Sequence, residues 1–264
     1  MSDILSELAA GAVERTAEAK QKIPLEEMKE MAFAKGCDTG FPFHKALVKE
    51  GMSFICECKK ASPSKGLIAA DFPYVKIAQE YEEAGASAVS VLTEPTRFLG
   101  SVDYLKEISE AVKIPVLRKD FIVDPYMIYE AKAYGAAAVL LIVSLLSEDQ
   151  LREYIAIAHG LGLDTLVEAH DENEVPTAVK AGADIIGVNN RNLRDFTVDF
   201  GNSLRLRSLV PKNILFVAES GVHTREDIVK LEEGHMDAVL IGEQLMRSEN
   251  KKQMLAELKG IQEA

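Results

Sequence analysis

The chain has 264 residues, 47% of them hydrophobic and 27% charged, a composition typical of one large globular domain or two ordinary ones. Its formal net charge is −12, and Lys59–Lys60 and Lys251–Lys252 are its longest basic clusters, so we expect no nucleic-acid partner. No stretch approaches the roughly 18 consecutive apolar residues that a membrane span needs, so we expect no membrane partner either.

Cysteine and histidine usage indicates the compartment and the chemistry. Cys37, Cys56 and Cys58 form no paired framework, and the last two are expected to be small core side chains. The N-terminal segment carries charge in every turn, unlike a secretory signal, so we expect a cytoplasmic chain. The five histidines have no metal-binding spacing such as HExxH, and we expect no metal.

The first fifty residues contain helical patterns only. Apolar residues recur at the helical period in residues 3–22 and 25–34, and a shorter helix is expected at 43–50. No strand pattern precedes residue 51. We therefore expect residues 1–50 to form an N-terminal helical extension and residues 51–264 to form the single structural domain.

From residue 51 onward, short β-branched apolar runs alternate with helical segments. The expected strands are 54–58, 88–92, 116–117, 138–142, 165–167, 185–188, 214–217 and 238–241. The expected helices are 74–84, 101–112, 126–134, 148–161, 172–181, 201–209, 224–232 and 244–261. Alternation favours a parallel sheet, and eight units without a linker favour an α/β fold with a single (β/α)8 TIM barrel. The alternative is a doubly wound open sheet, which the lack of a GxGxxG motif disfavours.

Polar residues follow the expected strands at one end, where a barrel of this kind places its active site. The opposite ends carry Gly-Ala or Ile-Pro pairs, which are typical of structural positions. The polar and glycine residues at the first end are Glu57, Lys59, Thr93, Glu94, Arg118, Lys119, Asp120, Ser144, Glu168, Asn189, Asn190, Arg191, Glu219, Ser220, Gly221, Gly242 and Glu243. Their recurrence in unit after unit indicates a functional site.

The charged members of this set favour acid–base chemistry. A crowded barrel mouth would lower the pKa of Lys59 and Lys119 and raise that of Glu57, Glu168 and Glu219, while the lysines oppose the latter effect. The sequence shows no Ser/His/Asp set and no cofactor-binding motif, so no cofactor is expected. A Schiff base on Lys59 or Lys119 is the alternative chemistry.

A phosphate site is expected where the last two strands meet the loop at residues 59–66. Barrels commonly bind phosphate after their seventh and eighth strands, and this basic, Ser/Gly-rich loop would lie beside them on closure. The candidate phosphate ligands are Lys60, Ser62, Ser64, Ser220, Gly221 and Gly242. The candidate apolar walls for an aromatic group are Phe98, Phe121 and Leu193.

The stretches ECKKASPSKG at 57–66, LRKDFI at 117–122 and GVNNRNL at 187–193 resemble the indole-3-glycerol phosphate synthase family of tryptophan biosynthesis. Further similar stretches extend the resemblance over essentially the whole chain. It implies a cofactor-free conversion of 1-(2-carboxyphenylamino)-1-deoxyribulose 5-phosphate to indole-3-glycerol phosphate, CO2 and water. It also implies that the N-terminal block helps to close the site and that no phosphoribosylanthranilate isomerase is fused to the chain.

The resemblance also implies a role for each matching residue. Lys119 is similar to the general acid that protonates the sugar carbonyl, and Glu168 to the general base of the dehydration. Lys59 is similar to the lysine that holds the anthranilate carboxylate, although family members divide the acid roles between the two lysines differently. The implied electrostatic and hydroxyl-orienting partners are Glu57, Asn189 and Glu219. The implied substrate-binding residues are Lys60, Ser62, Ser64, Phe98, Phe121, Arg191, Leu193, Ser220, Gly221, Gly242 and Glu243.

Two residues depart from the usual pattern of this family, and three other barrel functions are the alternatives to this interpretation. Cys58 and Asn190 replace residues more common in the family, but neither occupies a charged role. Phosphoribosylanthranilate isomerase would show Cys and Asp as its acid–base pair, and the histidine-pathway isomerase two Asp. A non-catalytic phosphate-sensing barrel would need no such lysine–glutamate set. The expected partner is a phosphorylated small molecule, and the expected state is a monomer or weak homo-oligomer.

Overall fold

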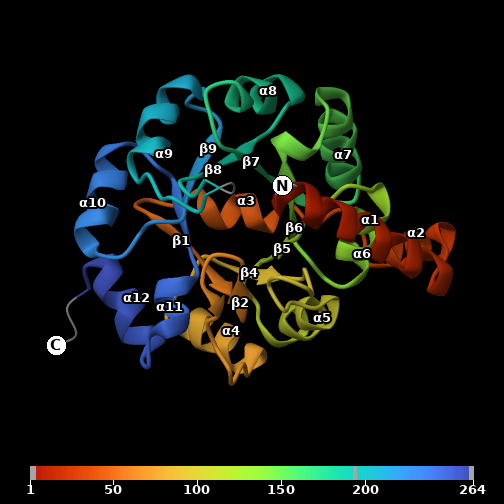
Figure 1. The fold of residues 1–264 in the computed structure, drawn as a ribbon, viewed down its shortest axis with the longest axis horizontal. Helices are drawn as coiled ribbons and strands as arrows, with labels where there is room; N and C mark the ends of the chain where they lie inside the picture. Colours follow the sequence, from red (N-terminus) through yellow and green to blue (C-terminus); the bar gives the residue numbers. More distant parts are fainter. Residues whose placement is uncertain (1–3, 193–194, 262–264) are drawn as a thin grey trace.

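The computed structural model describes residues 4–192 and 195–261. Within these residues, eight parallel strands form a closed barrel in the order β1-β10-β9-β8-β7-β6-β5-β4, with helices around it (Figure 1). The barrel strands are β1 (Ser53–Cys58), β4 (Ala88–Leu92), β5 (Val116–Lys119), β6 (Ala138–Ile142), β7 (Asp164–Ala169), β8 (Ile185–Asn189), β9 (Leu215–Glu219) and β10 (Ala238–Ile241). This confirms the predicted (β/α)8 barrel.

The described helices include three before the barrel and others between or after its strands. The first three are α1 (Ile4–Lys22), α2 (Leu25–Ala34) and α3 (Pro42–Leu47). The others are α4 (Tyr74–Glu83), α5 (Val102–Ala111), α6 (Pro125–Ala133), α7 (Glu148–Gly160), α8 (Glu174–Ala181), α9 (Gly201–Leu206), α10 (Arg225–Glu233), α11 (Glu243–Arg247) and α12 (Lys251–Lys259), with 3-10 turns η1 (Val143–Leu145) and η2 (Arg207–Leu209). None of the described helices is long and apolar enough to cross a membrane.

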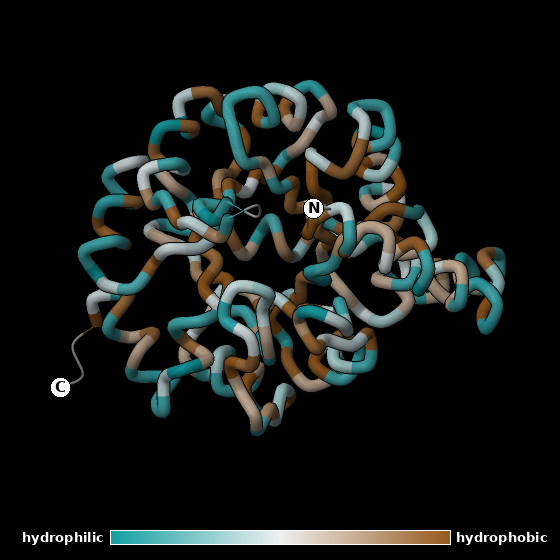
Figure 2. Tube along the Cα trace, in the orientation of Figure 1, coloured by the Kyte–Doolittle hydropathy of each residue, from teal (hydrophilic) through white to brown (hydrophobic). Residues whose placement is uncertain are grey.

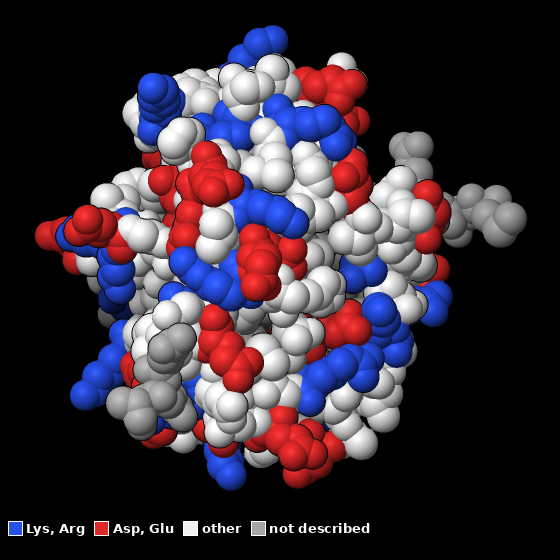
Figure 3. All heavy atoms as spheres, turned by 90° about the vertical axis from the view of Figure 1, so that its left-hand side faces the viewer, with Lys and Arg blue, Asp and Glu red and all other residues white. Residues whose placement is uncertain are grey.

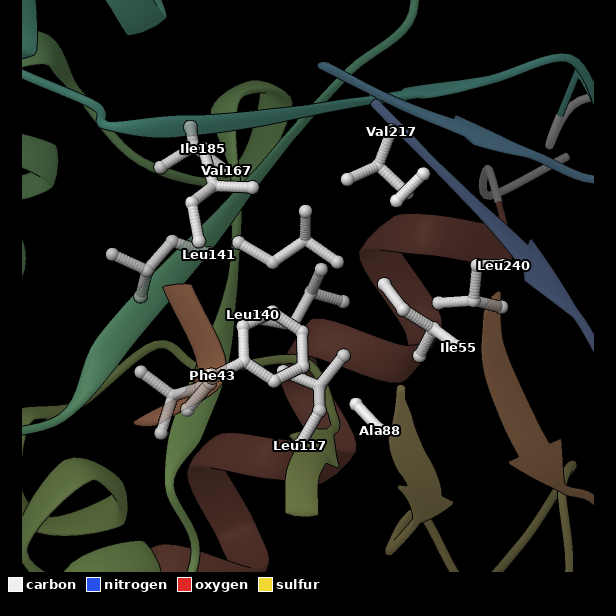
Figure 4. Packing of buried hydrophobic residues seen from close by; sticks show 14 of the residues in the cluster. Phe43, Ile55, Ala88, Leu117, Leu140, Leu141, Val167, Ile185, Val217 and Leu240 are labelled. Atoms are coloured by element: carbon white, nitrogen blue, oxygen red, sulfur yellow. The ribbon is translucent and has the colours of Figure 1, made fainter. Parts of the chain in front are cut away.

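The barrel interior is packed with aliphatic side chains from successive strands (Figure 4). Phe43 of α3 lies among them, and its backbone N–H, like that of His44, donates to Oδ2 of Asp164 at 3.0 Å. Asp164 begins β7, so α3 closes the amino-terminal end of the barrel. Brown segments gather at the middle of the molecule in Figure 2, whereas the surrounding helices alternate teal with brown, as expected for parallel strands buried on both faces.

The two helices before α3 are attached to the outside of α6. Tyr126 of α6 is 1% exposed and packs with Met28 of α2, and its hydroxyl donates to the carbonyls of Ala19 and Ile23 at 3.3 and 3.0 Å. Figure 1 shows α1 running across the barrel and α2 extending beyond its outline. This attachment fixes the direction in which α1 crosses the barrel.

Two local predictions were wrong or incomplete. The helix expected at 244–261 is two helices, because Asn250 leaves the helical conformation and its side chain accepts from the backbone N–H of Gln253 at 3.0 Å, which caps α12. The loop after β1 contains a short hairpin, β2 (Ala61–Ser62) and β3 (Gly66–Leu67), that no alternating pattern predicted.

The face of the molecule drawn in Figure 3 carries positive and negative groups side by side, so this face has no extended basic patch.

Candidate active site

A cavity that opens to solvent lies at the carboxyl-terminal ends of the barrel strands. Barrel enzymes bind and transform their substrates at this end. Its walls include most of the residues predicted from the sequence: Glu57, Lys59, Ser62, Ser64, Phe98, Lys119, Phe121, Glu168, Asn189, Arg191, Glu219, Ser220, Gly221, Gly242 and Glu243. The structure therefore brings residues from six different strand ends to one site.

Lys119, at the end of β5, lies between two carboxylates. Its Nζ is 3.2 Å from Oε2 of Glu168 and 3.3 Å from Oε2 of Glu219. Burial would lower the pKa of Lys119, but the two carboxylates outweigh it and hold that pKa well above its usual range. In the free protein this ammonium therefore stays charged.

Glu168 and Glu219 respond to this arrangement in opposite ways. Burial would raise the pKa of Glu168, but Lys119 and His170 hold it well below its usual range. Burial raises the pKa of Glu219 to about 8, against the attraction of Lys119 and with added repulsion from Glu168. Oε1 of Glu219 is buried and receives no hydrogen bond from the described residues. The pair thus places a carboxylate and a carboxylic acid on one ammonium, a division typical of acid–base sites.

A second ion pair lies at the end of β1. Nζ of Lys59 is 2.6 Å from Oε1 of Glu57, and Ser90 donates to Oε2 of Glu57 at 3.5 Å. Gly242, after β10, leaves room for this pair, because a Cβ there would lie 2.5 Å from Oε1 of Glu57 and 2.9 Å from Nζ of Lys59. Any larger residue at position 242 would therefore clash with the ion pair of Glu57 and Lys59.

The predicted phosphate end of the cavity is built from turns. Ser220 and Gly221 have φ values of 68° and 84°, so the chain turns sharply after β9. Ser62 and Ser64 approach each other with Oγ atoms 3.5 Å apart in the hairpin loop. The turn after β9 and the loop after β1 thus both reach the cavity wall, and Pro63 lines it between the two serines.

Glu243 orders the cations near these turns. Its carboxylate is 3.5 Å from Nζ of Lys65 and 4.0 Å from Nη2 of Arg191. Burial would raise the pKa of Glu243, but Arg247 and Lys65 hold it below its usual range, so the group is ionised. Arg191 also donates to the carbonyl of Phe196 at 3.3 Å, which fixes its guanidinium at the cavity wall.

The opposite wall is apolar and includes α1. The rings of Phe98 and Phe121 lie 6.0 Å apart between centroids, and Leu5 and Leu8 of α1 reach the cavity beside them. Glu94 positions Phe98, because its carboxylate accepts from the backbone N–H of Phe98 at 2.9 Å. Such a wall suits a flat aromatic group.

Ion pairs hold α1 over this wall. Nη2 of Arg15 lies 2.9 Å from Oδ1 of Asp120, and Nη1 lies 3.5 Å from Oε1 of Glu94. Asp120 and Glu94 are 3% and 1% exposed, so a surface helix is anchored to two buried carboxylates. The apolar side chains of α1 therefore have a fixed place at the mouth.

Some sequence predictions do not meet at the cavity. Lys60 does not line it, and Leu193 lies outside the described residues. The Arg118 side chain points away from the cavity, since its Nη1 lies 2.7 Å from Oε2 of Glu130. The Asn190 side chain forms hydrogen bonds with the backbone of Ser203 and Ser220 instead. Ser144 faces a second cavity.

Sequence reasoning missed His170, whose Nε2 lies 3.3 Å from Oε1 of Glu168. Its position two residues beyond Glu168, on the side of an extended chain that Glu168 occupies, was the available signal. It also missed Leu5, Leu8 and Arg15, because helical periodicity does not say where a helix will dock. No group of three or more His, Cys, Asp or Glu placed to hold a metal occurs among the described residues.

Closed parallel strands with lysine–carboxylate pairs at their carboxyl ends define a (β/α)8 barrel with an acid–base site. The family described as Indole-3-glycerol phosphate synthase matches residues 5–258. The chain belongs to the indole-3-glycerol phosphate synthase family.

Curated relatives and solved structures agree with this assignment at different levels. The chain is 56% identical to the indole-3-glycerol phosphate synthase of Endomicrobium trichonymphae, over 97% of this chain and 99% of the relative. It is 55% identical to that of Ruminiclostridium cellulolyticum, with the same coverage. The solved structure of 3-hexulose-6-phosphate synthase from Salmonella typhimurium covers 80% of this chain and 98% of its own, with a TM-score of 0.65 and 14% identity. That likeness shows the fold alone.

Proposed function

We propose that this chain converts 1-(2-carboxyphenylamino)-1-deoxyribulose 5-phosphate to indole-3-glycerol phosphate, CO2 and water. Family membership supports the reaction, which makes the protein a carboxy-lyase of tryptophan biosynthesis. The observation that carries the proposal within the site is Lys119, held 3.2 and 3.3 Å from Glu168 and Glu219 inside the cavity. A charged ammonium between a carboxylate and a carboxylic acid supplies both acid and base within one site.

The first half of the reaction forms the carbon–carbon bond. The arene carbon that carries the carboxylate attacks the sugar carbonyl, and Lys119 donates a proton to the carbonyl oxygen as negative charge develops there. Loss of CO2 leaves its bonding electron pair in the ring and restores the aromatic system. Lys59 holds the anthranilate carboxylate and assists proton donation, with Glu57 fixing its ammonium at 2.6 Å.

The second half is a dehydration. The new hydroxyl leaves as water after it is protonated by an ammonium of the site. Glu168 removes the proton whose loss lets the pyrrole ring become aromatic, so its low pKa keeps it ready as a base. Asn189 and Glu219 orient hydroxyls, and the protonated carboxyl of Glu219 is suited to donate a hydrogen bond to one of them.

Substrate binding divides between the two ends of the cavity. The aromatic ring lies against Phe98 and Phe121, on the wall that α1 completes. The phosphate accepts hydrogen bonds from the turns after β9 and β10 and from the loop after β1. The residues proposed for it are Lys60, Ser62, Ser64, Arg191, Ser220, Gly221 and Gly242, with Glu243 ordering the nearby cations.

The organisation of the chain fits this role. Residues 1–50 act as an extension of the barrel formed by residues 51–264, and within it α1 closes the mouth, as the contacts of Arg15 with Asp120 and Glu94 support. Cys37, Cys56 and Cys58 are free thiols, in keeping with a reducing cytoplasm. A phosphorylated small molecule is the partner, and the working state is a monomer or weak homo-oligomer without nucleic acid.

The test is a fluorescence assay for the formation of indole-3-glycerol phosphate from the carboxyphenylamino-deoxyribulose phosphate in buffer containing EDTA. We expect turnover that is insensitive to the chelator. Binding of the substrate by folded protein without turnover would replace this proposal with a non-catalytic phosphate-sensing barrel. Turnover lost on chelation and restored by a divalent cation would overturn the lysine–glutamate mechanism.

A further inference from the structure

His170 lies between the catalytic cavity and a second, more polar cavity. It follows β7 and lines the second cavity with Asp171 and Glu174, whereas Glu168 lines the catalytic one. Its Nε2 atom is buried without a hydrogen-bond partner among the described residues, and it lies at the ion-pair distance of 3.3 Å from Oε1 of Glu168. The proposed catalytic base therefore has a histidine directly behind it.

Both ring nitrogens of His170 face carboxylates. Nδ1 lies 3.0 Å from Oε2 of Glu174, the first residue of α8, and the backbone N–H of His170 donates to the same oxygen at 2.7 Å. The backbone N–H of Glu174 donates to Oδ1 of Asp171 at 3.0 Å, and the side chain of Asn202 donates to the carbonyl of His170 at 2.9 Å. Contacts from α8 thus hold the ring of His170, and α9 holds its backbone.

The two oxygens of Glu168 have separate cationic neighbours. Oε2 faces Lys119 at 3.2 Å across the catalytic cavity, and Oε1 faces His170 at 3.3 Å on the other side. An imidazole with a carboxylate on each nitrogen is favoured as an imidazolium, since both nitrogens are then donors. The sequence of groups from the cavity outward is ammonium, carboxylate, imidazolium and carboxylate.

We propose that His170 is a positioning residue for the general base, and that its imidazolium, held by Glu174, fixes Oε1 of Glu168 so that Oε2 alone faces the reacting substrate. The inference rests on the proposed function, because it assumes that Glu168 acts as the base. His170 does not touch the substrate, since it lies outside the catalytic cavity.

The charges around His170 support this role. The facing groups are Glu168 on β7, Glu174 on α8 and, beyond Glu168, Lys119 on β5; Asp171, Arg191 and Asp199 line the outer cavity. Burial would lower the pKa of His170, but Glu168 and Glu174 raise it to about 10. The imidazolium therefore persists through neutral pH. Its removal takes one of two cations from Glu168 and raises the pKa of that carboxyl.

The first experiment compares kcat and KM over pH 3–10, a range that includes the acid side on which Glu168 titrates, for wild type, His170→Gln and Glu174→Gln. We expect His170→Gln to lower kcat about tenfold at pH 7.5, to leave KM within about twofold, and to move the acid-side midpoint of the kcat profile up by about one pH unit. Glu174→Gln should move the midpoint in the same direction by less. The control, His159→Gln, removes a histidine 3.9 Å from Asp184 on the amino-terminal side of β7 and should leave the profile unchanged.

The second experiment needs no turnover. Nitrogen-15 NMR of the histidine rings should show both nitrogens of His170 protonated at pH 8 in wild type, and Glu174→Gln should lower the pH at which this signature is lost. A His170→Gln profile that coincides with wild type after scaling overturns the inference, as does a neutral His170 at pH 7. If wild type shows the imidazolium but no turnover, the proposed function fails while the ionic arrangement stands.

Discussion

Gly187 of β8 lies directly beside the carboxyl group of Glu219 on β9, and a Cβ on Gly187 would overlap Oε1 of Glu219. Asn189 of β8 pairs with Glu219 of β9 in the barrel register, so both residues come from strands that are fixed by the parallel sheet. The position of the Glu219 carboxyl thus depends on the absence of a side chain on the neighbouring strand.

Gly187→Ala should therefore displace Glu219 and disturb its contact with Lys119. We expect a loss of about 1–3 kcal/mol in the free energy of unfolding, because a fully packed barrel has little room to relax, and a fall in kcat of at least about tenfold. Urea unfolding and steady-state kinetics measure the two effects. The control is Gly160→Ala near the end of α7, where no heavy atom lies within 4 Å of the added Cβ. Equal effects of the two substitutions would contradict the steric explanation.

Lys119→Met removes the ammonium but keeps much of the side-chain volume. We expect kcat to fall about 10³-fold or more, because the carbonyl oxygen loses its proton donor, while the dissociation constant for the substrate changes by less than about tenfold. Steady-state turnover and calorimetric titration separate the two quantities. Lys106→Ala, which removes an exposed lysine of α5, is the control for the change in net charge. Near-normal turnover in Lys119→Met would remove Lys119 from the acid role.

Glu168→Gln should act on the second half of the reaction. Ring closure and CO2 release need no base, whereas the loss of the last proton does, so CO2 release should continue faster than the formation of indole-3-glycerol phosphate. Single-turnover measurements that follow CO2 and fluorescence together test this, with an intermediate expected to accumulate. If both signals slow equally, Glu168 acts before decarboxylation instead.

Lys60 remains a prediction from the sequence, because it does not line the catalytic cavity. Its backbone carbonyl accepts from the N–H groups of Ile68 and Ala69 at 2.9 and 3.1 Å, which closes the loop after β1. If its ammonium reaches the phosphate, Lys60→Ala should raise KM about tenfold and leave kcat within about twofold. Lys106→Ala again controls for net charge. An effect confined to kcat would exclude a phosphate role.

The barrel and much of the site could be predicted because both depend on periodic signals. Apolar runs such as Ala138–Ile142 match the observed strand, and residues just after such runs, including Lys119 and Glu168, meet at one end because parallel strands share their direction. The docking of α1 through Arg15 could not be predicted, since it depends on an ion pair with the distant residue Asp120. The helix break at Asn250 is local, a side-chain cap on the backbone N–H of Gln253, and the prediction of one continuous helix overlooked it. His170 was missed because a lone histidine carries no pattern of its own.

Glu219 should make stability depend on pH in a window set by its own titration. Its pKa is raised to about 8 in the folded protein from 4.5, so the folded state binds the proton more tightly. The stabilisation is fully present below about pH 4.5 and is lost as the pH rises through about 8. Glu219→Gln mimics the neutral acid and should remove this pH dependence of stability. The titrations of Lys119 and Glu168 lie outside this pH window, and the titration of His170 contributes to both wild type and Glu219→Gln.

Urea unfolding of wild type and Glu219→Gln at pH 5, 7 and 9 measures the effect. Wild type should lose at least about 1.4 kcal/mol relative to the variant between pH 5 and 9, the equivalent of one pKa unit. Glu226→Gln, at an exposed position in the first turn of α10, is the control and should follow wild type at all three pH values. Parallel curves for wild type and Glu219→Gln would mean that Glu219 is ionised in the folded protein, and the hydrogen-bond donor proposed for the substrate hydroxyl would then have to be Asn189 alone.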